Sequence, residues 1–333
     1  MPITHFKALL VSESPGNIFS SEIVTRELNT LPKGEVLIRV KYSSLNYKDA
    51  LSASGNKGVT RSYPHTPGID AAGIVAESTS EKFQAGDQVL VTGYDLGMNT
   101  SGGYGQYIRV PADWVVKLPQ NLSLRQSMAY GTAGFTAALS VYKLLQAGLK
   151  PAAGEILVTG ATGGVGSIAV GILHKLGYRV VAATGKTAAK DMLMQLGASD
   201  IITREELNDT SGRSLLKEHW AGAIDTVGGN MLSTVLKSTC YGGSITCCGN
   251  VASPDLLTSV YPFILRGITL YGVDSVMCPM DLRVTLWSFL AGEWKPLHLE
   301  QHVEEVSLTG IMKKIDFILQ GKLQGRTIVN LDL

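Results

Sequence analysis

The sequence predicts an α/β protein that combines a doubly wound parallel sheet with a mostly β domain. Short strands separated by Gly, Pro, Ser and Asn occupy the first third of the chain. Beyond Leu124 the pattern changes to alternating helices and buried strands, and a glycine-rich turn follows at 159–166. A chain of 333 residues is long enough for two domains.

The expected elements follow in chain order. In the mostly β part, from Phe6 to about Asn121, the clearest strands are expected at 36–40, 73–75, 88–91 and 106–110. The parallel sheet is expected to contain strands at 156–158, 178–183, 201–202, 223–225, 244–247 and 268–270. From about Val273 the chain predicts helices at 282–290 and 311–319, an extended piece near Val303 and a last strand at 327–329.

The glycine-rich turn joins an apolar strand at 156–158 to a helix with one apolar face, which Gly177 ends. Glycines let the backbone approach a pyrophosphate closely, and the helix N-terminus offers N–H donors and a positive dipole end. Glycine turns also occur as simple connections, but here a strand precedes and a helix follows. We therefore expect a dinucleotide diphosphate over Gly163, Gly164, Val165 and Gly166.

The end of the second strand, at 178–183, indicates which dinucleotide is bound. A carboxylate about 20 residues past the glycine fingerprint would bind the 2′-hydroxyl of NAD. This chain instead has Thr184, Gly185 and Lys186, with no carboxylate before Asp191. A hydroxyl and an ammonium group can hold a 2′-phosphate, so the sequence predicts NADPH.

Arg204 is expected to join Lys186. It follows the short strand at 201–202, and the usual strand order 3-2-1 brings the end of the third strand beside that of the second. Two cations would then converge on one phosphate. The alternative is that both are ordinary solvated surface charges.

Composition limits the classes of partner. The formal net charge of +1 gives no support for nucleic acid or a charged membrane surface. The N-terminus lacks a secretory apolar run, and glycine and threonine interrupt the longest uncharged stretches, so no membrane span is expected. The four cysteines form no C-x-x-C pair, which argues against a disulfide framework and favours a cytoplasmic protein.

Motifs along nearly the whole chain resemble the medium-chain dehydrogenase/reductase superfamily. Besides the nucleotide turn, segments 67–75, 86–89 and 102–107 occur in the family's order. The resemblance implies a Rossmann domain inserted into a chaperonin-10-like catalytic domain. The corresponding domains are 1–124, 125–273 and 274–333.

Four further segments, 44–50, 130–137, 262–266 and 272–276, resemble the NADPH-dependent acrylyl-coenzyme A reductase group, often labelled putative quinone oxidoreductases. This similarity implies a set of cofactor contacts. They are Tyr47, Gly163, Gly164, Val165, Gly166, Thr184, Gly185, Lys186, Arg204, Asn250, Ile264, Ser275 and Arg326.

The metal positions depart from the superfamily's zinc alcohol dehydrogenases. Where those carry a cysteine and a Gly-His-Glu, this chain has Asn46 and the sequence Gly-Ile-Asp at 68–70. Catalytic zinc needs three protein ligands and an open position, so no metal is expected. His298 and His302 have the i, i+4 spacing of a helical metal pair, but Pro296 and the lack of a paired acid motif argue against that.

Without a metal, hydrogen-bond donors must stabilise the negative charge that develops during reduction. An α,β-unsaturated carbonyl suits this, because hydride reaches the β-carbon, charge collects on the carbonyl oxygen and the α-carbon takes a proton. Tyr47 is the expected catalytic hydroxyl, and Asn46 and Asp49 are expected to shape the same corner. Lys57 and Arg61 are candidates for coenzyme A phosphates, although solvated surface charges explain them equally well.

Three functions remain open at this point. The first is NADPH-dependent reduction of an enoyl thioester such as acrylyl-coenzyme A, and the second is reduction of a quinone. The third is a non-catalytic NADPH-binding protein with a structural or regulatory role, which the fold alone permits. Superfamily members commonly pair edge strands, so we expect a homodimer through the strand at 268–271.

Overall fold

The structure is a computed structural model that describes residues 4–333, apart from the side chain of Thr187. The chain divides into two compact units. Unit 1 contains the residues up to Thr132, together with Val276–Ala291 and Val303–Leu333; unit 2 contains Ala133–Ser275 and Gly292–His302. The expected domains 1–124, 125–273 and 274–333 remain predictions, and the residues after 273 contribute to both units.

Unit 2 is built on a six-stranded parallel sheet, as the sequence predicts. Its strands are β8 (Glu155–Val158), β9 (Arg179–Thr184), β10 (Asp200–Thr203), β11 (Trp220–Asp225), β12 (Thr239–Cys247) and β13 (Thr269–Gly272). The spatial order is β10-β9-β8-β11-β12-β13, which is the doubly wound order. Every residue of β11 is buried, as expected for a central parallel strand covered on both faces.

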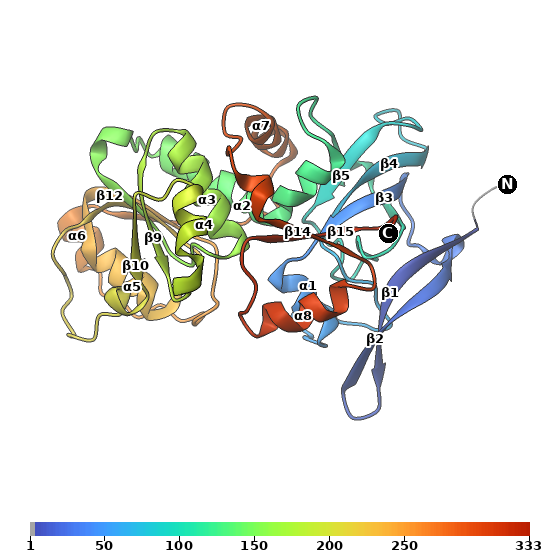
Figure 1. The fold of residues 1–333 in the computed structure, drawn as a ribbon, viewed down its shortest axis with the longest axis horizontal. Coiled ribbons are helices and arrows are strands. Elements are labelled where there is room, and N and C mark those ends of the chain that lie inside the picture. The colour runs from blue at the N-terminus through green and yellow to red at the C-terminus, as the bar shows by residue number, and fades with distance from the viewer. Residues whose placement is uncertain (1–3) are drawn as a thin grey trace. The chain divides into compact units, whose positions relative to one another are not determined.

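Helices surround this sheet (Figure 1). They are α3 (Gly164–Lys175), α4 (Lys190–Gln195), α5 (Gly229–Ser238), α6 (Tyr261–Arg266) and the unit 2 portion of α2 (Leu124–Gln146). Short 3₁₀ turns lie at η3 (Pro151–Ala153), η4 (Thr187–Ala189), η5 (Glu205–Leu207) and η6 (Leu299–His302).

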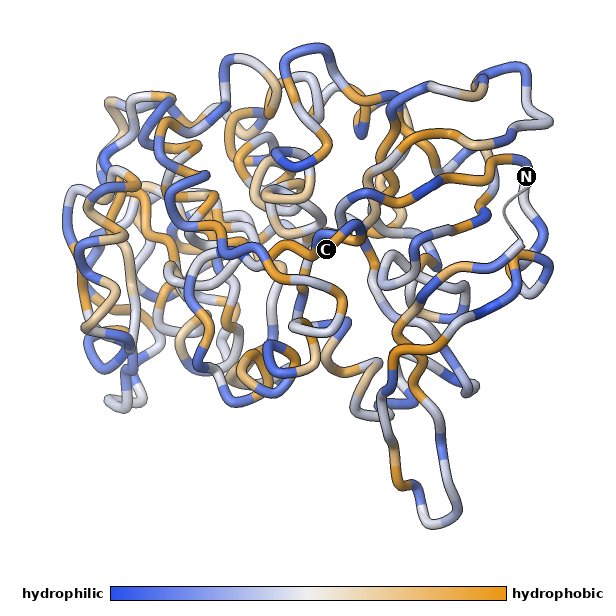
Figure 2. The backbone as a smooth tube through the Cα atoms, turned by 45° about the vertical axis from the view of Figure 1, so that its right-hand side comes forward, coloured by the Kyte–Doolittle hydropathy of each residue, from blue (hydrophilic) through white to orange (hydrophobic). Residues whose placement is uncertain are grey.

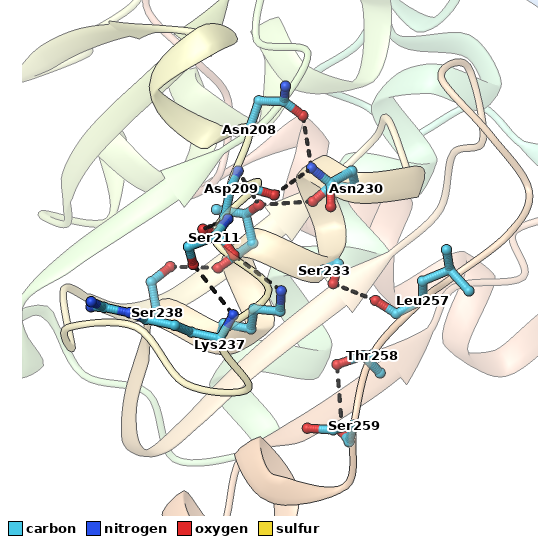
Figure 3. Close-up of polar contacts among 12 residues, drawn as sticks. Asn208, Asp209, Ser211, Asn230, Ser233, Lys237, Ser238, Leu257, Thr258 and Ser259 are labelled. Atoms are coloured by element: carbon cyan, nitrogen blue, oxygen red, sulfur yellow. Dashed lines mark hydrogen bonds and ion pairs between the residues drawn. The ribbon is translucent and has the colours of Figure 1, made fainter.

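Polar contacts fix the irregular segment after η5 against α5 (Figure 3). Lys237 Nζ lies 3.1 Å from Asp209 Oδ2, and Asn230 Nδ2 donates to Asn208 Oδ1 at 2.7 Å. On the same helix, Ser233 Oγ donates to the carbonyl of Leu257. The loop before α6 is therefore held by its main chain, while the Leu257 side chain points away from the contacts.

Unit 1 is mostly β, again as predicted. Its main sheet has the order β14-β15-β3-β4-β5-β7, with β6 also paired to β3. The strands are β3 (Val36–Ser44), β4 (Asp70–Ser78), β5 (Gln88–Thr92), β6 (Tyr107–Val110), β7 (Val116–Lys117), β14 (Val303–Ser307) and β15 (Arg326–Asn330). A separate hairpin of β1 (His5–Ser14) and β2 (Ile18–Glu27) projects from this unit (Figure 1).

The first part of α2, up to Thr132, also belongs to unit 1. The other helices and 3₁₀ turns described in this unit are α1 (Tyr47–Ala53), α7 (Met280–Ala291), α8 (Ile311–Leu319), η1 (Leu28–Thr30) and η2 (Ala112–Trp114). α1 and α8 lie side by side (Figure 1). Inward residues of β3, such as Val36, Ile38 and Val40, pack with Ile311 and Ile315 of α8 in one core. Apolar and polar stretches alternate along the whole backbone (Figure 2). No helix within residues 4–333 is both long and apolar enough to cross a membrane.

Candidate active site

One candidate region lies in unit 1, where β3 passes into α1. Tyr47 is the first residue of α1, and its side chain is 42% exposed. Asn46 occupies the N-cap position in extended conformation, and its main-chain N–H donates to Asp49 Oδ2 at 2.8 Å. This reciprocal cap fixes the start of the helix. The three residues predicted to be catalytic therefore lie together, with only Tyr47 directed toward solvent.

A buried polar cluster lies beneath this helix start, and we call it the Asp70 cluster. Its members are Ser44, Asn46, Asp49, Asp70, Thr132 and Arg326. Asp70, the first residue of β4, is fully buried. Its carboxylate accepts hydrogen bonds from Ser44 Oγ at 2.5 Å, Asn46 Nδ2 at 2.7 Å, Thr132 N at 2.8 Å and Thr132 Oγ1 at 2.5 Å. Four donors thus satisfy one buried carboxyl group.

Asp49 is the second buried carboxylate of the Asp70 cluster. Besides the Asn46 main chain, it binds the main-chain N–H of Ile69 at 2.8 Å through Oδ1. Burial, reinforced by the neighbouring charge of Asp70, raises the pKa of Asp49 to about 7. Its protonation state is consequently expected to change near neutral pH, unlike that of an exposed aspartate.

Arg326, a predicted cofactor contact, is only 3% exposed. Its Nε donates to the carbonyl of Ala129 at 3.0 Å, and Nη1 donates to the carbonyl of Leu45 at 3.0 Å and to Asn46 Oδ1 at 3.4 Å. Burial lowers its pKa, whereas the charges of Asp70 and Asp49 act in the opposite direction. These bonds tie Arg326 to the helix start, and its contact with a cofactor remains a prediction.

A second candidate region lies in unit 2, at the turn between β8 and α3. Gly163 caps α3, and Gly166 packs so closely on the turn that an added Cβ would collide with the carbonyl of Gly160. Glycine at this position lets the helix begin directly behind the strand. The first N–H groups of α3, from Gly164 onward, have no acceptor within the helix and form a site suited to an anion.

The end of β9 carries the residues predicted to read the adenosine. Thr184 Oγ1 accepts a hydrogen bond from the main-chain N–H of Lys186 at 3.0 Å. β10 pairs with β9 in register, so that Thr203 lies beside Thr184, as the expected strand order requires. Arg204 follows immediately, and a Cβ added to Gly185 would collide with its guanidinium group.

Lys186 and Arg204 are therefore close to each other. Burial, together with the positive charge of Arg204, lowers the pKa of Lys186. Two neighbouring cations are the arrangement expected for binding a dianionic phosphate.

The remaining predicted contacts are more scattered. Asn250 is exposed in the loop that follows β12. Ser275 is 9% exposed, and its Oγ accepts a hydrogen bond from Thr136 at 2.9 Å. Ile264 lies on α6 and is 67% exposed. The candidate for coenzyme A phosphates, Lys57, is paired with Glu13 at 2.6 Å, which neutralises much of its charge.

Sequence reasoning missed the centre of the Asp70 cluster. Asp70 and Thr132 are 62 positions apart, and neither stood out as a functional residue. The one available signal was the glycine at 131. It has φ 52°, and an added Cβ there would collide with Asp70 Oδ2 and Ser44 Oγ. A glycine inside a helical pattern can mark such a close approach.

The residues at the superfamily's zinc positions are engaged with one another. The Asn46 amide donates to Asp70, and Ile69 contributes its main-chain N–H to Asp49. Within the described part of the chain, no group of three or more His, Cys, Asp and Glu side chains is placed to hold a metal ion. His302 ends the 3₁₀ turn η6, which begins after His298, so these histidines do not share an α-helix.

Two family models match the sequence. Residues 32–120 match the alcohol dehydrogenase GroES-like domain, and residues 164–292 match the zinc-binding dehydrogenase family. A relative named putative quinone oxidoreductase YhfP, from Bacillus subtilis, is 48% identical over 98% of this chain and 99% of its own length. Another, named probable acrylyl-CoA reductase AcuI, from Escherichia coli, is 44% identical over 98% of this chain and its full length.

Two solved structures superpose on nearly the whole of this chain. The yhdH oxidoreductase from Salmonella enterica in complex with NADP superposes with a TM-score of 0.95 at 44% identity, covering 98% of this chain and 99% of that one. Bacillus subtilis yhfP with NAD bound gives a TM-score of 0.96 at 48% identity, covering 99% and 100%. Similar folds have thus been solved with either form of the dinucleotide.

Proposed function

Because this chain belongs to the medium-chain dehydrogenase/reductase superfamily, we propose that it is an NADPH-dependent, metal-independent reductase of α,β-unsaturated carbonyls. Hydride would go to the β-carbon of an enoyl thioester such as acrylyl-coenzyme A. The observation that carries the cofactor assignment is the convergence of Lys186 and Arg204 at the end of β9. The relative named acrylyl-CoA reductase supports the substrate class.

The residues of unit 2 fit a phosphorylated dinucleotide. The N-terminus of α3, with Gly163, Gly164, Val165 and Gly166, would bind the diphosphate through main-chain N–H groups. Lys186 and Arg204, with the Thr184 hydroxyl nearby, would bind the 2′-phosphate. When bound, NADPH supplies the hydride. Asn250, Ile264, Ser275 and Arg326 remain proposed contacts.

Tyr47 supplies the proposed chemistry of unit 1. Its exposed hydroxyl would donate a hydrogen bond where negative charge develops on the substrate carbonyl, or hold the nicotinamide in position. Removing one such donor costs about 2.7–4 kcal/mol in the transition state. Tyr47→Phe should therefore reduce kcat about 100- to 1000-fold. Unchanged turnover would contradict this role.

Quinone reduction is the second candidate, because the 48% identical relative is named a putative quinone oxidoreductase. Steady-state oxidation of NADPH, followed by its absorbance, distinguishes the two when acrylyl-coenzyme A and a simple quinone are offered in parallel. We expect the higher kcat/KM with the thioester. No loss of absorbance with the thioester, the quinone or a simple enone would instead indicate the non-catalytic NADPH-binding protein.

The unpaired edge of unit 2 supports a homodimer as the working assembly. β13 pairs with β12 on one side, and no strand within the described residues pairs with its other edge. Large apolar side chains are exposed on α6 and in the loop before it: Val251, Leu257, Val260, Tyr261, Ile264 and Leu265. A second copy could pair its own β13 across a two-fold axis and cover these side chains.

A further inference from the structure

We propose that Asp70 is a positioning residue for this reaction: its buried carboxylate fixes Asn46 and thereby sets the position of Tyr47. The inference rests on the proposed function, in which the Tyr47 hydroxyl acts on the substrate or cofactor. It adds a residue that the sequence does not single out and that reaches the chemistry only through another.

The first step is the contact between Asp70 and Asn46. The Asn46 amide is held from two sides, because Nδ2 donates to Asp70 Oδ2 at 2.7 Å while Oδ1 faces Arg326 Nη1 at 3.4 Å. Its main-chain N–H is bound to Asp49. Buried carboxyl and guanidinium groups therefore hold both the side chain and the main chain of the N-cap residue.

The second step leads from Asn46 to Tyr47. Tyr47 follows the N-cap directly and is 42% exposed, so side-chain packing limits its position less than it would a buried tyrosine. The placement of its hydroxyl then depends on where the main chain enters α1. Asp70 governs that entry, because it is bound both to Asn46 and to Ser44, which ends β3.

The third step concerns the remaining hydrogen bonds of the buried Asp70 carboxylate. Main-chain angles at Gly131 break α2, and Thr132 begins its second half. Asp70 binds both the main-chain N–H and the hydroxyl of Thr132, so its carboxyl group lies at the N-terminus of that helical half. Every group that contacts the carboxylate side chain in these bonds is a donor.

These contacts make Asp70→Asn an informative variant. An amide has nearly the same shape, but only one of its two ends can accept. If the nitrogen takes the Oδ2 position, it faces the Asn46 amide and the Thr132 N–H, which cannot accept; if it takes the Oδ1 position, the Thr132 hydroxyl must turn and accept, and the bond to Asn46 is made by a neutral oxygen. A displacement of about 1 Å at a catalytic group can cost up to about 100-fold in rate. We expect kcat with acrylyl-coenzyme A to fall within that limit. The Kd for NADPH should change less than kcat, because the proposed phosphate contacts belong to unit 2.

A double-mutant cycle separates positioning from a general structural effect. Asp70→Asn, Tyr47→Phe and the double variant are compared for kcat, for NADPH binding by fluorescence titration, and for Tm. If Asp70 acts through the Tyr47 hydroxyl, it should cost little further once that hydroxyl is gone. Asp113→Asn makes the same chemical change at an exposed carboxylate of unit 1 and should leave kcat unchanged.

The outcomes are distinguishable. Wild-type turnover in Tyr47→Phe removes the proposed function of the tyrosine, and the positioning role with it. Two other results would overturn the positioning role alone, provided that Tyr47→Phe lowers kcat. The first is that the losses of kcat in the two single variants add in the double variant, and the second is that Asp70→Asn is fully active. If Asp70→Asn does not fold, Thr132→Val decides, since it removes one hydroxyl donor and keeps the carboxylate. Thr132→Val should lower kcat when it is made in the wild-type protein but not when it is made in Tyr47→Phe. Equal losses of kcat in these two proteins would overturn the proposal.

Discussion

Lys186 and Arg204 are the residues on which the choice of dinucleotide depends. Holding two cations together is unfavourable unless an anion lies between them, and the pKa of Lys186 is already lowered by burial and by Arg204. A 2′-phosphate relieves this repulsion, whereas a 2′-hydroxyl does not. Hydrogen bonds to charged groups contribute about 1.5–3 kcal/mol. Lys186→Ala should therefore lower kcat/KM for NADPH roughly 10- to 150-fold and change that for NADH little.

The matched control for this prediction is Lys190→Ala, an exposed lysine at the start of α4. It removes the same charge a few residues further along the chain and should leave both values of kcat/KM near wild type. Equal losses with NADPH and NADH in Lys186→Ala would mean that the lysine serves the fold or the shared part of the dinucleotide.

Asp49 predicts a specific dependence of stability on pH. Its pKa rises from the ordinary value of 3.8 to about 7 in the folded protein, chiefly through burial and then through Asp70. Between these two values the folded state binds more protons than the unfolded state, so its free energy of unfolding falls as pH rises. Below about 3.8 the protonated residue contributes fully, and above about 7 that contribution is lost.

Asp49→Asn should remove the part of the pH dependence of stability that Asp49 causes. Thermal denaturation of wild type and variant between about pH 3.8 and pH 7 measures this part. The difference in Tm between wild type and Asp49→Asn should shift in favour of the variant as pH rises, because the amide carries no charge to bury. If the difference in Tm stayed constant with pH, Asp49 would titrate outside this pH range.

At the scale of elements, the break in α2 is the feature with the clearest cost. Gly131 adopts φ 52° and ψ −155° within a helix of 23 residues, a conformation that is almost confined to glycine. A Cβ at this position would also collide with Asp70 and Ser44. Gly131→Ala should lower the free energy of unfolding by more than the roughly 1–3 kcal/mol expected from the dihedral angles alone.

Gly148→Ala is the control for that prediction. Gly148 also has a positive φ, of 86°, but an added Cβ there would have no neighbour within 4 Å. Chemical denaturation of both variants separates backbone strain from the collision. If Gly131→Ala cost no more than Gly148→Ala, the Asp70 cluster would have room to adjust and its geometry could not be tightly constrained.

The same elements indicate what sequence alone could predict. The turn at Gly163, the strands around it and the neighbouring ends of β9 and β10 follow from local periodicity and a fixed strand order, and the structure confirms them. The hairpin of β1 and β2 was not predicted, although it forms a sheet of its own. The Asp70 cluster was missed because its members come from four separate segments, and hydrogen bonds between such distant residues leave no periodic pattern.

At the scale of the whole molecule, the open edge of β13 and the apolar side chains near it point to a second copy of the chain. Burying apolar surface contributes roughly 25 cal/mol for each Å² removed from water. Leu257 and Ile264, which are 84% and 67% exposed, stand on a loop and a helix whose main chains are held in place. A preformed apolar face requires little ordering on association.

The prediction is that the wild-type chain of 35.5 kDa elutes at twice that mass in size-exclusion chromatography with light scattering, at micromolar concentration. Leu257→Asp combined with Ile264→Asp should give the monomer mass, because burying two carboxylates without partners opposes association. Met194→Asp is the control: it is 48% exposed on α4, beside β10 at the opposite edge of the sheet. A wild-type monomer would contradict the assembly, and a monomer produced by Met194→Asp instead would move the interface to the β10 edge.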